Sequence, residues 1–418
     1  MHLLFILTLF FSSTLFAKLH VDVGATSAIL INSKTGKVLF EKNALQSMYP
    51  ASCTKIAFAL YAIKHYEHLF EETLKASNNA LKCLPESQKS KNNFNAYPSY
   101  ILETDASHMG LKLDEEMSFY DLLEATMVVS ADDASNVLAE VMGNGSIEQC
   151  VENVNQFVAS LGLVSTRFMN PHGLHHPEHV TTAHDLAKLS QEAMKEPLFQ
   201  KIAKTPRFLR PKTNKQPSTY LQSTNRLIVK GSNAFYAPAI GIKTGYHRRA
   251  GYCLVAAAEN QDRSLIAVVL QGASRDARFS DTKKLFQAAF SEKKIATTYL
   301  QAGSQSFSKE IEGGKSPIVT YSNEPVSYAY YPSDEPDMRL SLVWNTLSLP
   351  LKKDSPVATL ILSADGHIVK KTTLFAASSV EETLFHKLEK KCGPYGLIVL
   401  GILVSIALVT LAFVYRRF

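Results

Sequence analysis

A serine and a lysine three residues apart are the first side chains in this sequence that could do chemistry together. Ser52 and Lys55 have the spacing S-x-x-K, and residues three apart share one face of a helix, so the Lys55 amine can approach the Ser52 hydroxyl. A serine hydroxyl is a weak nucleophile until a base removes its proton. Lys55 can be that base only when it is neutral, which requires burial or a second nearby cation to lower its pKa. The pair predicts a nucleophile, although S-x-x-K alone occurs by chance in many helices.

A second group of side chains follows in the run Lys243, Thr244 and Gly245, which reads K-T-G within a strand-like segment. The Lys243 ammonium offers charge, Thr244 offers a hydroxyl, and Gly245 has no side chain to obstruct an extended peptide. These groups suit the C-terminal carboxylate of a peptide, and Lys243 can also supply the second cation that the S-x-x-K lysine needs. Backbone N–H groups of Ser52 and Tyr246 would form an oxyanion hole.

The elements that must position these motifs are a helix and a set of strands. The pattern predicts a helix over 52–66 and strands over 240–244, 252–258 and 264–271. A turn sequence separates two short β-like runs near the N-terminus, which predicts a hairpin. Helical patterns complete the first 293 residues, and they cover 118–128, 134–142, 182–193 and 283–290.

The character of the sequence changes after about residue 294. Helical periodicity disappears, and short alternating runs are broken by Pro, Gly, Ser and Asp. Because alternation with period two is typical of strands, 294–380 is predicted to be a small all-β domain. A chain of 418 residues is too long for one compact core, so two or three domains are expected.

The composition argues against several classes of site. The net charge of +6 is spread along the chain without a long Lys/Arg block, so no nucleic-acid partner is expected. Five widely spaced cysteines without a C-x-x-C pair predict neither a zinc site nor a disulfide framework. Four histidines crowd one loop, but Pro and Gly between them break any helix that would align them, so no metal is expected. These histidines are His172, His175, His176 and His179.

Both ends of the chain carry apolar segments that point to a membrane. Residues 1–17 resemble a secretory signal, with an uncleaved anchor as the competing interpretation. Residues 395–415 contain no charged side chain and are long enough to cross a bilayer as a helix. A linker over 381–394 would precede this span, and a cytoplasmic tail over 416–418 would follow it. If the signal works, the rest of the chain lies outside the cytoplasm, held to the inner membrane by one C-terminal span.

The three motifs together resemble one enzyme family. S-x-x-K, a triplet from Ser130 to Asp132 where S-x-N is expected, and K-T-G occur in the order found in low-molecular-mass penicillin-binding proteins that are D-alanyl-D-alanine carboxypeptidases. The resemblance covers roughly residues 25–380, and four further stretches support it: 49–52, 170–174, 225–227 and 241–246. It implies an α/β (α+β) transpeptidase-like fold, in which a helical subdomain packs against a five-stranded antiparallel sheet. The resemblance also implies that residues 18–293 form a catalytic domain and that the β-rich domain comes after it in the chain.

The resemblance also implies a role for each residue of the motifs. Ser52 would attack the penultimate D-Ala carbonyl of a peptidoglycan stem peptide, with Lys55 as the general base and Ser130 passing a proton to the leaving amine. Lys243 and Thr244 would hold the substrate carboxylate. Arg278, thirty-five residues beyond Lys243, would orient that corner of the site. β-Lactams would trap Ser52, and no cofactor is implied.

Asp132 is a departure from this family pattern, because the family has Asn there. Asn can donate to a substrate carbonyl and accept from a lysine, whereas an ionised Asp can only accept. The Asp132 charge would also raise the pKa of Lys55 and oppose its action as a base. Slower acylation or an altered substrate preference is therefore predicted, unless Asp132 is protonated.

Three further functions remain open from the sequence. A serine β-lactamase would use the same acylation with fast deacylation, but no Glu-containing loop that would activate the water is evident. A DD-endopeptidase would cut crosslinked stem peptides at the same serine. A catalytically weakened scaffold that binds the cell wall is the third of these functions, and Asp132 is its only support in the sequence.

Overall fold

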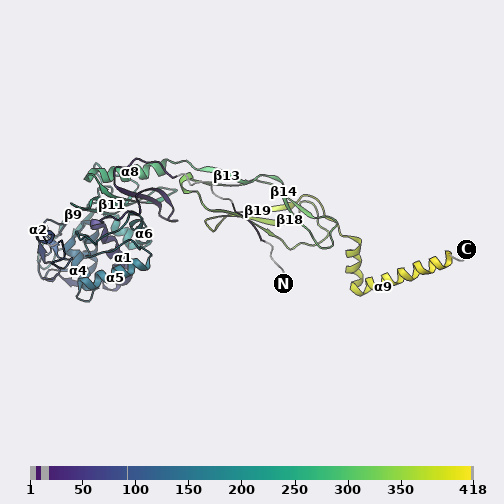
Figure 1. Ribbon diagram of the computed structural model, residues 1–418, viewed down its shortest axis with the longest axis horizontal. Coiled ribbons are helices and arrows are strands. Elements are labelled where there is room, and N and C mark those ends of the chain that lie inside the picture. Colours follow the sequence, from purple (N-terminus) through teal and green to yellow (C-terminus); the bar gives the residue numbers. More distant parts are fainter. Residues whose placement is uncertain (1–5, 11–17, 92, 416–418) are drawn as a thin grey trace. The chain divides into compact units, whose positions relative to one another are not determined.

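The computed structural model describes residues 6–10, 18–91 and 93–415 (Figure 1). The chain divides into two units, one over 17–292 and one over 293–418 that also includes the N-terminal residues up to 16. The motifs of the sequence all lie in the first unit.

A five-stranded sheet forms the centre of the first unit. Its strand order is β10-β11-β12-β2-β3, and every neighbouring pair is antiparallel, as predicted. Because both faces of the sheet are covered, its inner strands β2, β11 and β12 read as nearly continuous apolar runs. The bounds are β2 Ser27–Asn32, β3 Val38–Lys42, β10 Ala239–His247, β11 Gly251–Glu259 and β12 Ser264–Gly272.

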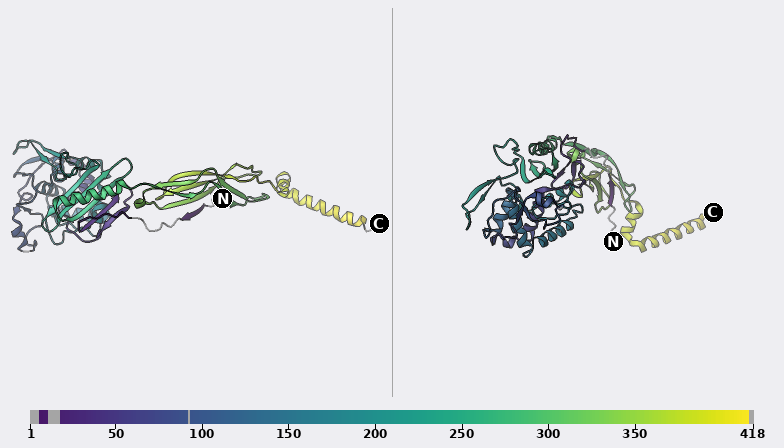
Figure 2. Two further views of the ribbon diagram at one scale, coloured as in Figure 1. Left: turned by 90° about the horizontal axis from the view of Figure 1, so that it is seen from above. Right: turned by 60° about the vertical axis from the view of Figure 1, so that its left-hand side comes forward.

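Alternate residues of these strands enter two separate cores. Leu254, Ala256 and Val269 lie in a core with Phe279 and Phe286 of α8, which spans Arg275–Ser291. The intervening residues, such as Val255 and Val268, pack in the larger core formed by the helical subdomain. Figure 2 shows α8 running along the strands on its own face of the sheet. The sheet is therefore the middle layer of three. Helices pack on both of its faces, and this packing holds the strands in position relative to the helices.

The helical subdomain carries Ser52, the predicted nucleophile, and its neighbours. The predicted helix over 52–66 is divided into a 3₁₀ turn, η1 Ala51–Thr54, and helix α1 Lys55–His65. The remaining helices are η2 Glu67–Leu69, α2 Glu86–Ser90, α3 Phe119–Val128, α4 Asp132–Met142, α5 Ile147–Ser160, α6 Ala183–Ala193 and α7 Pro197–Ala203. Short strand pairs join them, formed by β4 Thr73–Lys75 with β7 Glu116–Ser118, β5 Cys83–Leu84 with β6 Leu102–Glu103, and β8 Arg207–Arg210 with β9 Thr219–Gln222.

The second unit contains the β-rich region expected after residue 294. A six-stranded sheet has the order β1-β17-β18-β19-β15-β14, and β13 pairs with β16 alone. The N-terminal strand β1, Ile6–Phe10, pairs antiparallel with β17, although most of the predicted signal over 1–17 lies outside the described residues. The bounds are β13 Ile295–Leu300, β14 Gly303–Lys309, β15 Ile318–Ser322, β16 Val326–Tyr330, η3 Pro332–Asp334, β17 Met338–Trp344, β18 Pro356–Ala364 and β19 His367–Ala376.

The last element is helix α9, Leu384–Tyr415, which is interrupted at Gly393 with a φ of 69°. No helix within 6–10, 18–91 and 93–415 combines the length and the apolarity that crossing a membrane requires. The transmembrane helix predicted over 395–415 is therefore not confirmed.

Candidate active site

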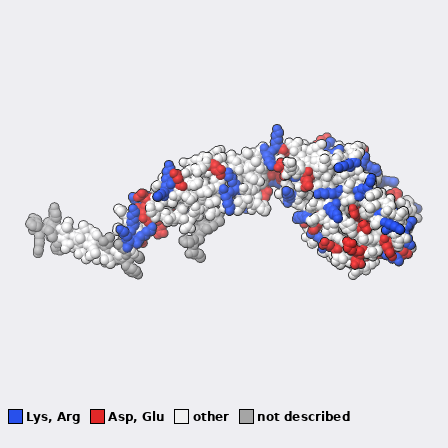
Figure 3. Space-filling view, turned by 180° about the vertical axis from the view of Figure 1, so that it is seen from behind, with Lys and Arg blue, Asp and Glu red and all other residues white. Residues whose placement is uncertain are grey.

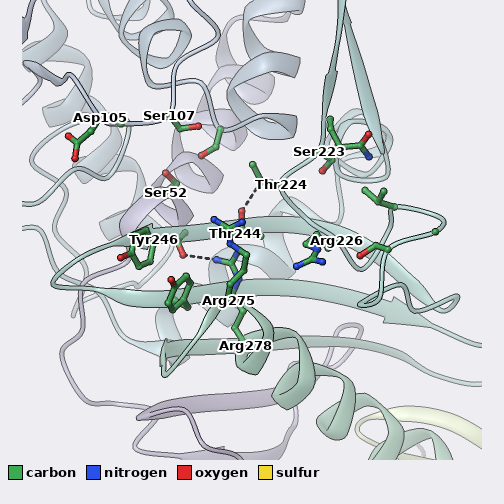
Figure 4. A pocket seen from close by; sticks show the side chains of 18 of the residues that line it. Ser52, Asp105, Ser107, Ser223, Thr224, Arg226, Thr244, Tyr246, Arg275 and Arg278 are labelled. Atoms are coloured by element: carbon green, nitrogen blue, oxygen red, sulfur yellow. Dashed lines mark hydrogen bonds between the residues drawn. The ribbon is translucent and has the colours of Figure 1, made fainter.

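Ser52 and Lys55 meet as the S-x-x-K spacing predicted. The Lys55 Nζ lies 3.1 Å from the Ser52 Oγ, and the lysine side chain is fully buried. Ser52 is half-buried and lines a pocket of about 830 Å³ (Figure 4). Ser52 thus faces a space large enough for a substrate, whereas Lys55, its predicted base, is kept from solvent.

The turn that carries Ser52 is held by strained and tightly packed backbone. Ala51 has a φ of 47°, a left-handed conformation that costs a non-glycine residue about 1–3 kcal/mol and persists only where its surroundings hold it. The Thr54 hydroxyl donates to the Ala51 carbonyl at 2.8 Å. His179 Nδ1 accepts from the backbone N–H of Met169, so its Nε2–H donates to the Thr54 oxygen at 2.8 Å. The histidine loop therefore supports the nucleophile turn.

Gly245 is required by the same turn. A Cβ at this position would lie 2.8 Å from the Pro50 carbonyl oxygen and 3.1 Å from the Ser52 nitrogen. The space left by the missing side chain is therefore occupied by the nucleophile turn, in addition to any role in peptide approach. Because β10 is an edge strand of the sheet, an extended peptide could still pair along it.

Lys55 is surrounded by three oxygen atoms. Its Nζ donates to Ser52 Oγ, to Asp132 Oδ1 at 2.6 Å and to the carbonyl of His172 at 2.7 Å. Burial lowers the pKa of Lys55, and the charge and hydrogen bond of Asp132 raise it again. Burial raises the pKa of Asp132, and Lys55 opposes that shift. Asp132 therefore contacts Lys55, the predicted general base, directly.

Asp132 and Asp133 occupy the first turn of α4, where a helix favours negative charge. The Asp133 carboxylate accepts the backbone N–H groups of residues 109, 110 and 111. Asp133 therefore fixes a loop, whereas Asp132 is directed to the lysine. Ser130 precedes them with a φ of 67° and lines the pocket.

Lys243 is fully buried and does not line the pocket. Its Nζ donates to the Thr244 carbonyl at 3.1 Å, and burial, helped by the charge of Lys55, lowers its pKa to about 7. Lys243 thus lies close enough to Lys55 for the two charges to interact, and its action as the cation that lowers the pKa of Lys55 stays a prediction. The Thr244 hydroxyl lines the pocket and donates to Thr224 at 2.7 Å.

Arg278 acts on the strand that borders the pocket. Its Nη1 donates to the carbonyls of Gly245 at 2.9 Å and Cys253 at 3.1 Å, so the guanidinium ties β10 to β11 from α8 (Figure 4). Cys53, next to the nucleophile, is fully buried, and burial raises its pKa, which leaves the thiol protonated and unreactive.

Several pocket residues could not be found from the sequence. Arg226 belongs to a stretch noted for its family resemblance, but nothing indicated that it would line the site. Tyr252 lies on β11, within a predicted strand, but nothing indicated that it would face the pocket. The others lie on loops or at the start of α8, where no motif or periodicity marks them. The missed lining residues include Asp105, Ser107, Ser223, Thr224, Arg226, Tyr252 and Arg275.

The four histidines of the 172–179 loop do not gather as metal ligands, and in the described part of the chain no cluster of three or more His, Cys, Asp or Glu could hold a metal ion. They act as neutral hydrogen-bonding groups instead. His175 accepts from Arg249 at 2.9 Å, and its ring lies 5.4 Å from that of His247. Burial lowers the pKa of His175 to about 4 and that of His247 to about 3.

Comparisons with known proteins agree on one family. Residues 14–274 match the family model described as D-alanyl-D-alanine carboxypeptidase. The chain is 30% identical over 364 residues to the D-alanyl-D-alanine carboxypeptidase DacF of Bacillus subtilis, covering 86% of this chain and 87% of the relative. It is 29% identical over 364 residues to DacC of Escherichia coli, with 86% and 85% covered.

Solved structures give the same result. Penicillin-binding protein 5 from Haemophilus influenzae is similar with a TM-score of 0.57 and 25% identity, covering 86% of this chain and 98% of that one. The DD-transpeptidase of Streptomyces K15, in its S96A form, has a TM-score of 0.56 and 26% identity, covering 65% of this chain and 99% of that chain.

Gly173→Ala tests how far the histidine loop positions the nucleophile. A Cβ at Gly173 would lie 2.0 Å from the Ala51 carbonyl oxygen, so the Ser52 turn must move. We expect Ser52 to react with a fluorescent penicillin at least about tenfold more slowly, because a misplacement of about 1 Å at a reacting group costs up to a hundredfold in rate.

Gly110→Ala is the matched control. Gly110 has a φ of +83° against +91° for Gly173, but nothing lies within 4 Å of its added Cβ. This variant carries the same backbone strain without the clash and should keep its reactivity within about twofold. Equal losses in the two variants would show that strain alone is responsible.

The buried histidines predict a loss of stability in mild acid. His175 and His247 titrate near their usual pKa of about 6.5 when unfolded, but at about 4 and 3 when folded. Unfolding therefore takes up protons as the pH falls below about 6.5, and each proton lowers the free energy of unfolding by about 1.4 kcal/mol per pH unit. Urea unfolding at several pH values between 7.5 and 5 measures the slope of the free energy of unfolding against pH.

The variant His175→Gln should flatten this slope, whereas His68→Gln, at an exposed position, should leave it unchanged. An unchanged slope in His175→Gln would contradict the assignment of the pH dependence to the buried His175.

Proposed function

The chain belongs to the D-alanyl-D-alanine carboxypeptidase family, and we propose that it carries out this serine-type hydrolysis through an acyl-enzyme on Ser52. One observation carries the assignment: the Ser52 Oγ lies 3.1 Å from the buried Lys55 Nζ, at a pocket bordered by the K-T-G strand. A nucleophile within hydrogen-bond distance of a base is the arrangement that acyl transfer needs. The substrate proposed is the D-Ala-D-Ala end of a peptidoglycan stem peptide.

In the first half of the reaction, Ser52 attacks the carbonyl between the two D-Ala residues as its proton leaves toward Lys55. The N–H groups of Ser52 and Tyr246 would hold the developing oxyanion. Ser130, which lines the pocket, would pass a proton to the leaving amine, so that the terminal D-Ala departs. Water then cleaves the ester on Ser52 and releases the shortened peptide.

The substrate carboxylate would be recognised through the Thr244 hydroxyl, which faces the pocket. Lys243 does not line the pocket, because its Nζ is buried and donates to the Thr244 carbonyl, so its charge would act on the carboxylate without direct contact. Arg278 keeps that strand in place through the Gly245 carbonyl. A β-lactam carries a carboxylate and an acylating carbonyl, so it would occupy the same pocket and acylate Ser52.

We also propose that the chain is attached to the inner membrane by α9, with the catalytic unit outside the cytoplasm. Residues 396–415 contain no Lys, Arg, Asp or Glu, and Figure 3 shows the uncharged stretch of α9 in white. Many of its apolar side chains are exposed, among them Ile402, Leu403 and Leu408 at 54%, 57% and 63%. An exposed apolar surface of this kind marks a membrane or protein contact. Basic side chains precede it, as in segments that bind anionic lipid.

A D-Ala-D-Ala-terminated pentapeptide tests the activity. The protein should remove a single alanine, detected by mass analysis, and Ser52→Ala should abolish the reaction. Ser160→Ala, an exposed serine at the end of α5, is the matched control and should be unaffected. No product from the pentapeptide, with cleavage of a crosslinked dimer instead, would assign endopeptidase activity.

Labelling with a fluorescent penicillin distinguishes three possible functions: a carboxypeptidase, a β-lactamase and a cell-wall scaffold. The label is measured on the wild-type protein and on the variants of the preceding experiment. A carboxypeptidase should keep the label on Ser52, and Ser52→Ala should remove it. Rapid loss of the label with turnover of the drug would indicate a β-lactamase. Binding to cell wall without any label would favour the scaffold.

Membrane attachment predicts where the protein fractionates. The full chain should sediment with membranes and resist a high-salt wash, because buried apolar area holds it there. A chain ending at Glu381 should be released. Leu403→Lys should weaken attachment, whereas Leu113→Lys, at 51% exposure in the catalytic unit, should not. A soluble full-length protein would contradict this proposal.

A further inference from the structure

The hydrogen bonds around Lys55 account for every proton of an ammonium group. An ammonium has three N–H donors and no acceptor. The three oxygens within 3.1 Å of Nζ belong to Ser52, Asp132 and the His172 backbone, so each receives one donor. In this arrangement Lys55 has no lone pair with which to accept the Ser52 proton. A charged Lys55 can receive that proton only if it gives up one of its own.

Asp132 is placed to take the proton that Lys55 gives up. Its Oδ1 lies 2.6 Å from Nζ, and the two side chains are 3% and 0% exposed, so bulk water does not compete for the proton. We propose that Lys55 and Asp132 act as one shared base, in which Asp132 is the group that finally holds the proton of Ser52. This inference rests on the proposed acyl transfer at Ser52.

The proton and charge balance closes within the site. The Ser52 Oγ forms a bond to the substrate carbonyl carbon, and the π electrons move to the carbonyl oxygen. The Oγ proton passes to the Lys55 Nζ while a different Nζ proton passes to Asp132 Oδ1. Lys55 stays an ammonium throughout, and one negative charge leaves Asp132 as one appears on the oxyanion. When the C–N bond breaks, Ser130 gives its proton to the leaving amine and takes one from Lys55, and Asp132 returns its proton to Lys55.

The environment of the pair makes this transfer less costly than it would be in water. Burial raises the pKa of Asp132 and lowers that of Lys55, so the two groups hold the proton with more similar affinity. The other titratable groups that act on the pair come from α4, β10 and the surrounding loops and turn. These groups are Asp133, Lys243, His108, His172, His179 and Cys53.

The shared base removes the difficulty that the sequence raised for Asp132. A carboxylate beside Lys55 opposes catalysis only if the lysine must become neutral before the attack. In the pair, Lys55 remains charged and relays the proton. Asp132 is therefore a catalytic residue in this chain, and the ion pair is the resting form of the base.

Infrared difference spectroscopy of a tetrahedral adduct tests the proposal directly. A boronic acid that adds to Ser52 forms an anionic tetrahedral boronate and displaces the serine proton. In the wild-type protein we expect one carboxylate band to be replaced by one protonated carboxyl C=O band for each Ser52 modified. Asp132→Asn should form the adduct without this band. Asp114→Asn, which removes a 52%-exposed carboxylate paired with Lys75, should show it unchanged.

A kinetic measurement gives a second readout that a structural role would not change. Acylation by penicillin in mixtures of H₂O and D₂O should show two protons in flight in the wild type, and one in Asp132→Asn. An adduct that forms in the wild type without the carboxyl band, or a one-proton inventory in both proteins, would overturn the shared base. Failure of Ser52 to react with either the boronic acid or penicillin would instead reject the proposed function.

Discussion

The burial of one amine determines how the catalytic unit is assembled. A lysine that is fully removed from water needs an acceptor for each of its protons, since an unpaired buried charge is strongly destabilising. Lys55 finds these acceptors in Ser52, in Asp132 at the start of α4 and in the carbonyl of His172. The three lie far apart in the chain, so satisfying this one side chain fixes where the η1 turn, α4 and the histidine loop meet. The placement of the nucleophile is thus a consequence of the placement of its base.

The sheet provides the second boundary of the site. Gly245 lets β10 approach the nucleophile turn so closely that a Cβ would be 3.1 Å from the Ser52 nitrogen. Arg278 on α8 bonds to carbonyls of both β10 and β11, so the position of the edge strand depends on the helix behind the sheet. The packing of α8 through Phe279 and Phe286 therefore contributes to the width of the pocket.

The sequence was informative wherever a local pattern carries the chemistry. The S-x-x-K pair and the K-T-G strand could be predicted from local pattern, because each depends on residues close together in the chain. The five-stranded sheet pairs β12 with β2, which lie more than 200 residues apart, so it was expected only from the family resemblance. The division of the first helix at Lys55 could not be predicted, because it follows from the strained Ala51 turn packing against Gly173 and Gly245. Loop residues of the pocket, such as those near Asp105 and Ser223, carry no periodicity and acquire their position only from tertiary contacts.

The buried charges explain why a carboxylate at position 132 is compatible with an acylating serine. Lys55, Lys243 and Arg278 are three buried basic side chains at the nucleophile turn and the adjacent strand, and Asp132 and Asp133 are two carboxyl side chains at the start of α4. Asp133 accepts the backbone N–H groups of residues 109, 110 and 111 and so holds that loop. Asp132 is the carboxylate bonded to Lys55, and its charge can therefore change during the reaction. A negative charge that moves from Asp132 toward the oxyanion stays near the same basic side chains, so the electrostatic field that stabilises the resting site also stabilises the tetrahedral intermediate.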